Sequence, residues 1–228
     1  MTMHPFSPAQ LASRHHSGSM RKTPLFLAAL LIVLAKGAQA MDFQIIKAVD
    51  GQQLVMGAGS IVTGDAQKLE AALQSADRDQ WGYKAIAFWS PGGLVSEAMA
   101  MVRVMDRQRV NTMVLDKTYC ASACSQILFV SGFYRMVTDG GMLGMHSCSR
   151  DGQASELCNE TIARNAVAHG VAHGAVMAFM EYTAPEGMLW FSAKDADCWG
   201  LTRWPPGFNR GVEPGQMAPC VQRGIMGR

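Results

Sequence analysis

The 228-residue chain holds 20 Lys and Arg residues against 18 Asp and Glu, and 49% of its residues are hydrophobic. The first 40 residues contain four of the basic residues and none of the acidic ones, so the rest carries 16 basic and 18 acidic residues, a net charge of −2. This balance leaves no basic patch that would favour nucleic acid or anionic lipid as a partner. The part after residue 40 is long enough for one domain with a full hydrophobic core.

The first 40 residues have the three parts of a secretory signal peptide. Basic residues precede an apolar run from Pro24 to Ala35, and Ala38-Gln39-Ala40 supplies the small residues of a cleavage site. The run is shorter than the roughly 20 residues that span a bilayer, so removal is favoured over retention as an anchor. We therefore expect a signal peptide over 1–40, starting at Met1 or Met20, a periplasmic or secreted protein, and no membrane attachment after cleavage.

All six cysteines follow residue 40; they are Cys120, Cys124, Cys148, Cys158, Cys198 and Cys220. An even number in an exported chain favours disulfides over free thiols. Six cysteines allow 15 pairings; Cys148 with Cys158 would close a short polar loop, and Cys198 with Cys220 would hold the C-terminal segment. A zinc site is less favoured because the chain has no C-x-x-C pair. We expect no metal and no cofactor.

Hydrophobic patterning after residue 40 predicts strands that alternate with helices. In chain order these are short strands within 43–62, a helix over 65–76 capped by Asp65, a strand over 84–89, a helix ending near Arg107, a strand over 113–115, a helix over 122–130, strands over 135–137 and 142–145, a long helix over 156–182 and a short helix over 192–199. The alternation predicts an α/β domain over 41–202, with a mostly parallel sheet flanked by helices. Residues 203–228 are rich in Pro and Gly and predict an irregular tail, unless a disulfide ties it down.

Three strand ends carry residues suited to catalysis. Ser90-Pro91-Gly92-Gly93 follows a strand, and its glycines allow a tight turn whose N–H groups could hold an oxyanion; a plain structural turn looks the same. Ser122 opens a helix between small residues, where it could cap that helix or act as a nucleophile with the Ala123 N–H as an oxyanion donor. His146 ends an apolar strand and could be structural or a general base.

The other two histidines after residue 40, His169 and His173, stand one helical turn apart. Such a pair can bind a metal, but no glutamate lies between them and no third ligand is evident. Flanking glycines weaken a helix there. We interpret both histidines as structural.

The order of the three strand-end motifs resembles the Clp protease family of serine peptidases. Ser-Pro-Gly-Gly, a serine flanked by small residues, and Gly-x-x-His match with gaps from about Leu54 to Thr202, and the chain is most similar to exported, cysteine-containing relatives. The resemblance implies the repeated β-β-α units of the Clp protease/crotonase fold. It also implies Ser122 as nucleophile, His146 as base, and Gly93 and Ala123 as oxyanion donors.

The third catalytic residue departs from the family pattern. Ser192-Ala193-Lys194-Asp195-Ala196 matches the segment that follows the family's aspartate, but Met188 stands at the acid's position. Glu186 is a candidate replacement, and a Ser-His dyad or an orienting backbone carbonyl is an equal alternative. In each case we expect a slow hydrolase, because an acid normally holds the imidazole in the productive tautomer.

Cys120 and Cys124 bracket Ser122 and could link the strand end to the first helical turn, fixing the serine in place. The alternative, in which one of them is the nucleophile, is less favoured, because an exported thiol tends to oxidise. Lys117 as a base in place of His146 is a minor variant.

The favoured hypothesis is an exported serine hydrolase acting on a peptide or protein substrate bound as an extended strand, with a homo-oligomer implied by the resemblance. The alternatives are an inactive binding or scaffold module and, less favoured, a crotonase-like acyl-thioester enzyme, whose soluble substrates are cytosolic.

Overall fold

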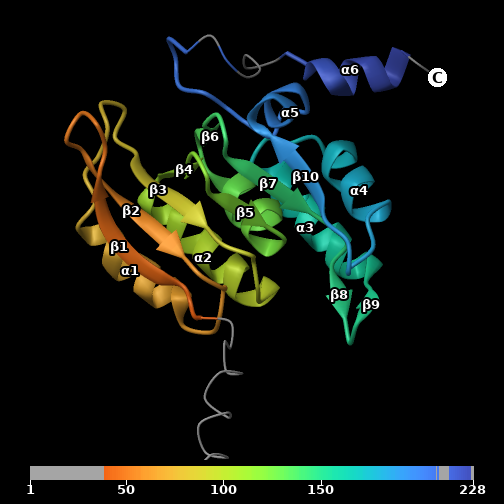
Figure 1. The fold of residues 1–228 in the computed structure, drawn as a ribbon, viewed down its shortest axis with the longest axis horizontal. Coiled ribbons are helices and arrows are strands. Elements are labelled where there is room, and N and C mark those ends of the chain that lie inside the picture. Colours follow the sequence, from red (N-terminus) through yellow and green to blue (C-terminus); the bar gives the residue numbers. More distant parts are fainter. Residues whose placement is uncertain (1–38, 209, 211–215, 227–228) are drawn as a thin grey trace, which may run out of the picture. The chain divides into compact units, whose positions relative to one another are not determined.

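The computed structural model describes residues 39–208, 210 and 216–226, so most of the expected signal peptide lies outside the described residues. A five-stranded sheet has the order β1-β2-β3-β4-β6 (Figure 1). These strands are β1 Asp42–Lys47, β2 Gln53–Ala58, β3 Lys84–Trp89, β4 Val110–Val114 and β6 Arg135–Val137. Only β1 pairs antiparallel with its neighbour; the other pairs are parallel. The prediction of an α/β protein with a mostly parallel central sheet is confirmed.

A second sheet of three strands carries two of the candidate catalytic residues at its strand ends. Its order is β10-β7-β5, and the strands are β5 Tyr119–Ala121, β7 Met142–Met145 and β10 Leu189–Ser192. β5 and β7 run parallel, with Ala121 opposite Gly144, while β10 is antiparallel to β7. A single bridge between Ser90 and Cys120 joins this sheet to the end of β3.

The helices cover the sheets and complete one hydrophobic core. α1 Asp65–Gln74 packs against α2 Val95–Gln108, and α2 also contacts the π-helix η1 Cys124–Leu128, which continues into the 3₁₀-helix η2 Phe129–Ser131. α3 Glu156–Ala168 and α4 His173–Glu181 pack together beside the second sheet (Figure 1). α1 and α2 bury apolar residues at helical spacing, for example Leu69, Leu73, Met101 and Met105.

Three local predictions differ from the structure. Gly64 caps α1, and Asp65 is instead the first helical residue, where its buried carboxylate accepts from the Val62 N–H at 2.8 Å and pairs with Lys68. The predicted helix over 156–182 is two helices, because Gly170 takes a left-handed φ of +79° and ends α3. The predicted helix over 122–130 is a π-helix followed by a 3₁₀ turn, not a regular α-helix.

Short elements and the C-terminal segment were also missed. A two-stranded hairpin, β8 Ser149–Arg150 and β9 Gln153–Ala154, occupies the expected polar loop. After α5 Ala193–Cys198, Arg203 still pairs through its backbone with Arg135 in β6. The segment 203–228 was expected to be irregular unless a disulfide ties it down; Cys198–Cys220 provides that tie, and Pro219–Met226 forms the helix α6. Proline and glycine content alone therefore underestimates the order of this segment.

Three disulfides form, and they join the pairs that the spacing suggested: Cys120–Cys124, Cys148–Cys158 and Cys198–Cys220. Disulfides persist in oxidising compartments, so this pattern fits a periplasmic or extracellular protein. Among the described residues, no helix combines the length and the apolar character needed to cross a membrane.

Candidate active site

Ser122 sits at a sharp turn between β5 and η1, with φ at +55°. A residue other than glycine adopts this left-handed conformation only at a cost of roughly 1–2 kcal/mol, and such strain is concentrated at functional sites. Two backbone hydrogen bonds hold the turn: the Ser122 N–H donates to Gly144 O at 2.9 Å, and the Gln126 N–H donates to Ser122 O at 2.9 Å. Ser122 is half-buried, so this turn is not sealed inside the core.

The segment after Ser122 is unusual in its helix type and in its covalent linkage. π-helices are rare in proteins, but those that do occur are often found at functional sites. The Cys120–Cys124 disulfide links the end of β5 to the first residue of η1, so it encloses Ser122 in a short covalent loop. The fully buried Ser125 donates from its hydroxyl to Gly144 O, which ties η1 to β7. The disulfide fixes Ser122 between β5 and η1, and the Ser125 hydrogen bond fixes this segment relative to β7.

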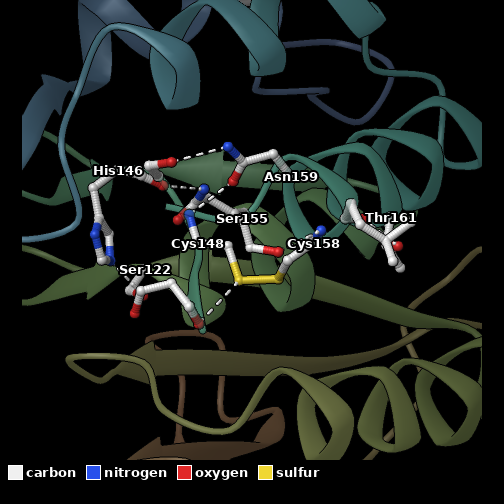
Figure 2. Close-up of a disulfide and its surroundings, with 11 residues drawn as sticks. Ser122, His146, Cys148, Ser155, Cys158, Asn159 and Thr161 are labelled. Atoms are coloured by element: carbon white, nitrogen blue, oxygen red, sulfur yellow. Dashed lines mark hydrogen bonds between the residues drawn. A yellow bond between two sulfur atoms is a disulfide. The ribbon is translucent and has the colours of Figure 1, made fainter. Parts of the chain in front are cut away.

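Strand pairing brings His146 to Ser122. β5 and β7 are parallel neighbours with Ala121 opposite Gly144, so the residues that follow each strand lie at the same edge of the sheet. His146 Nε2 is 2.7 Å from Ser122 Oγ, a hydrogen bond of normal length. Figure 2 shows the imidazole directed toward the serine side chain. The predicted pair is therefore within reach for proton transfer.

The Ser90–Gly93 loop lies directly against the serine. Ser90 exchanges backbone hydrogen bonds with β5: its N–H donates to Tyr119 O, and its carbonyl accepts from the Ala121 N–H, both at 2.9 Å. A Cβ placed on Gly92 would lie 2.7 Å from Ser122 Cβ and 3.0 Å from the Ala123 nitrogen. Only glycine permits this approach.

The two expected oxyanion donors, the N–H groups of Gly93 and Ala123, lie beside the serine turn and have no acceptor in the described part of the protein. Gly93 has a φ of +149°, and a Cβ there would lie 2.2 Å from Ile61 O, so this position also requires glycine. Free backbone N–H groups beside a nucleophile are the donor type that stabilises a developing oxyanion.

Among the described residues, no carboxylate hydrogen-bonds to His146. Its Nδ1 atom is buried and has no hydrogen-bond partner among the described residues. Glu186, the candidate third member, is exposed and has no hydrogen bond to the imidazole. The Met188 side chain packs against β7, with Sδ 2.7 Å from where a Gly144 Cβ would lie. Within the part of the chain that the structure describes, the arrangement is thus a Ser-His pair without an orienting acid.

Residues that sequence analysis missed hold the chain on both sides of the imidazole. The Gln126 side chain donates to His146 O at 2.8 Å, so η1 fixes the histidine backbone. Asn159, buried in α3, accepts from the Cys148 N–H at 2.7 Å and donates to Ser147 Oγ at 2.9 Å. Figure 2 shows how Asn159 and the Cys148–Cys158 disulfide both tie α3 to this segment. The only sequence signal for Asn159 was that a polar residue lies on the apolar face of a predicted helix.

The remaining candidates do not join this site. His169 contacts Asp106 at 3.1 Å, whereas His173 lies on α4 and contacts Glu160 at 2.9 Å. No group of three or more His, Cys, Asp or Glu side chains able to hold a metal occurs in the described part of the chain. Lys117 is exposed, and its ammonium lies 3.9 Å from Asp116.

No protein-family model matches the chain, and no curated protein matches it either.

Proposed function

We propose that the chain is an exported serine hydrolase of the Clp protease type that cleaves peptide or amide bonds, with Ser122 as nucleophile and His146 as base. The observation that carries the proposal is the 2.7 Å hydrogen bond between Ser122 Oγ and His146 Nε2, made by a serine in a strained turn. The order of sequence motifs and the two free N–H groups support the same assignment.

In the proposed reaction, His146 Nε2 takes the hydroxyl proton as Ser122 Oγ attacks the carbonyl carbon of the scissile bond. The carbonyl oxygen becomes an oxyanion, to which Gly93 and Ala123 donate from their N–H groups. The tetrahedral species collapses as His146 returns the proton to the leaving nitrogen, which gives an acyl-serine and an amine. Water activated by His146 then releases the acid and restores the serine.

The unpartnered Nδ1 atom predicts a low rate. For Nε2 to accept the serine proton, Nδ1 must carry the hydrogen, and this N–H is buried without an acceptor. A buried donor without a partner costs about 1–3 kcal/mol, which disfavours the productive tautomer. We therefore expect turnover slower than that of a complete Ser-His-Asp triad by one or more orders of magnitude.

A fluorophosphonate probe tests the proposal directly, because it labels only an activated serine. We expect labelling of the mature chain, no labelling of Ser122→Ala, and strongly reduced labelling of His146→Ala. Ser149→Ala, which removes an exposed serine in β8, is the matched control and keeps the full rate. If Ser122→Ala labels as well as the parent chain, the assignment is wrong.

The second candidate is a binding or scaffold module that has kept the fold and lost catalysis. The buried Nδ1 without an acid is the observation in its favour. This candidate predicts that neither the parent chain nor any variant reacts with the probe. A crotonase-like acyl-thioester activity is less favoured, because three disulfides fit an oxidising compartment, away from cytosolic thioesters. The implied homo-oligomer also belongs to the proposal, and light scattering of the mature chain would test it.

A further inference from the structure

A concave site lies apart from the Ser122–His146 pair. It is a cavity of about 500 Å³ between the end of α2, the start of β4, the residues after η2 and the end of α3. Apolar side chains, among them Met105, Val110 and Phe133, form part of its wall. Neither Ser122 nor His146 contributes to it. A pocket of this size, with apolar walls and a few polar groups, is suited to a small organic ligand.

A four-layer stack of side chains places two guanidinium groups at this cavity. Tyr83 and Phe133 stack with ring centroids 4.4 Å apart and planes 18° apart. Arg109 lies over the Tyr83 ring at 4.6 Å, and Arg203 lies over the Phe133 ring at 4.8 Å. All four residues line the cavity. Stacking on aromatic rings holds an arginine in place without neutralising its charge.

A third guanidinium lies directly behind the wall. Arg135 is 2% exposed, and its Nη1 donates to Gly132 O at 3.2 Å and to His169 O at 2.9 Å. Gly132 and His169 both line the cavity. Arg135 and Arg203 are backbone partners on neighbouring segments, so their charges repel. Burial and then the charge of Arg203 lower the pKa of Arg135 to about 9, which still leaves it charged at neutral pH.

The positive charge at this site is not balanced within the described part of the chain. Of the described residues, Asp106 alone places a carboxylate in the cavity lining, and it pairs with His169 at 3.1 Å. Arg109, Arg135 and Arg203 make no ion pair with any described carboxylate. Arg135 is the buried member of the three, and four backbone carbonyls accept from its guanidinium, namely those of Val130, Gly132, His169 and Leu201. Arg203 is half-buried and Arg109 is exposed, so an anion in the cavity would supply a counter-charge to guanidinium groups that have no carboxylate partner among the described residues.

We propose that this cavity binds a small organic carboxylate with an apolar body. The carboxylate lies at Arg203, near Arg135, because its two oxygens match the planar N–H fork of a guanidinium. The apolar body lies along Phe133 and the neighbouring aliphatic side chains. The C-terminal residue of a peptide with an aromatic side chain has this chemistry. The site does not depend on the proposed hydrolase function.

Isothermal titration calorimetry with N-acetylphenylalanine tests the site. N-acetylphenylalaninamide is the control ligand, since it has the same apolar body without the charge. Both are titrated into a Ser122→Ala background, so that the amide is not cleaved. We expect the acid to bind at least 10-fold more tightly than the amide.

Variants of Arg203 test where in the cavity the ligand binds. Arg203→Gln should weaken binding of the acid about 10-fold and abolish its advantage over the amide. Arg203→Lys, which keeps the charge and loses the fork, should give an intermediate affinity and guards against misfolding of the first variant. Arg150→Gln in β8 and His146→Ala should leave the affinity unchanged. Equal affinities for acid and amide, no heat from either, or unaltered binding in Arg203→Gln would each overturn the proposal.

Discussion

The contact between the Ser90–Gly93 loop and the serine turn can be tested by adding one methyl group. Gly92→Ala would place a Cβ 2.6 Å from Ala121 O and 2.7 Å from Ser122 Cβ, closer than real Cβ atoms approach such neighbours. Because these neighbours belong to the serine turn, relief requires the loop to move away from it. The donor at Gly93 then moves from the place where an oxyanion would form.

Gly64→Ala is a matched control for backbone strain. Gly64 has a φ of +94° and Gly92 a φ of +95°, but a Cβ on Gly64 meets nothing within 4 Å. Both variants therefore lose about 1–2 kcal/mol from the left-handed conformation. Gly92→Ala loses about 1–3 kcal/mol more through overpacking. The difference between the two variants isolates the steric term.

Urea denaturation and the rate of fluorophosphonate labelling measure the two effects. Gly64→Ala should be destabilised and should label at the parent rate. Gly92→Ala should be less stable than Gly64→Ala by about 1–3 kcal/mol, and its labelling should be about 100-fold slower, as for removal of one oxyanion donor. The reasoning fails if the two variants have equal stability and equal labelling rates.

Two further predictions concern the disulfides and the pH dependence of stability. Cys148→Ser/Cys158→Ser and Cys198→Ser/Cys220→Ser each open a loop, of 10 and 22 residues, and each should cost about 3 kcal/mol in urea denaturation. Only the first pair should also slow probe labelling, by about 10-fold, because Cys148 follows His146 closely; equal slowing by both pairs would contradict this. Hydrogen bonds from the Ser192 side chain and backbone lower the pKa of Asp195 below its ordinary value of 3.8. The ionised Asp195 therefore stabilises the folded state fully above pH 3.8, and this contribution is lost as the pH falls through the lower folded pKa. Asp195→Asn should cost under about 1 kcal/mol at pH 7, since the group is exposed, and should match the parent chain in acid denaturation below that range; a constant difference down to low pH would exclude the capping role.

Much of the site could be predicted from the sequence because its signals are local. Glycines at a strand end, a serine between small residues and cysteines at suitable spacing each report their own backbone requirement. The strands at 84–89, 135–137 and 142–145 were predicted with the bounds that the structure has. Helix ends were predicted less well: Gly170 ends a helix that the apolar pattern continues, because one residue with positive φ outweighs periodicity.

The sequence by itself determined which residues were chemically suited to the site and which compartment the cysteines favour. Only the tertiary structure decided that the Ser122 and His146 side chains meet, because this depends on the register of two strands that are distant in the chain. Only the tertiary structure also showed that His146 Nδ1 has no hydrogen-bond partner among the described residues. It likewise revealed the stack of Arg109, Tyr83, Phe133 and Arg203, which come from four separate segments of the chain. Contacts between residues far apart in the chain leave no periodic pattern in the sequence, so these features follow from tertiary packing alone.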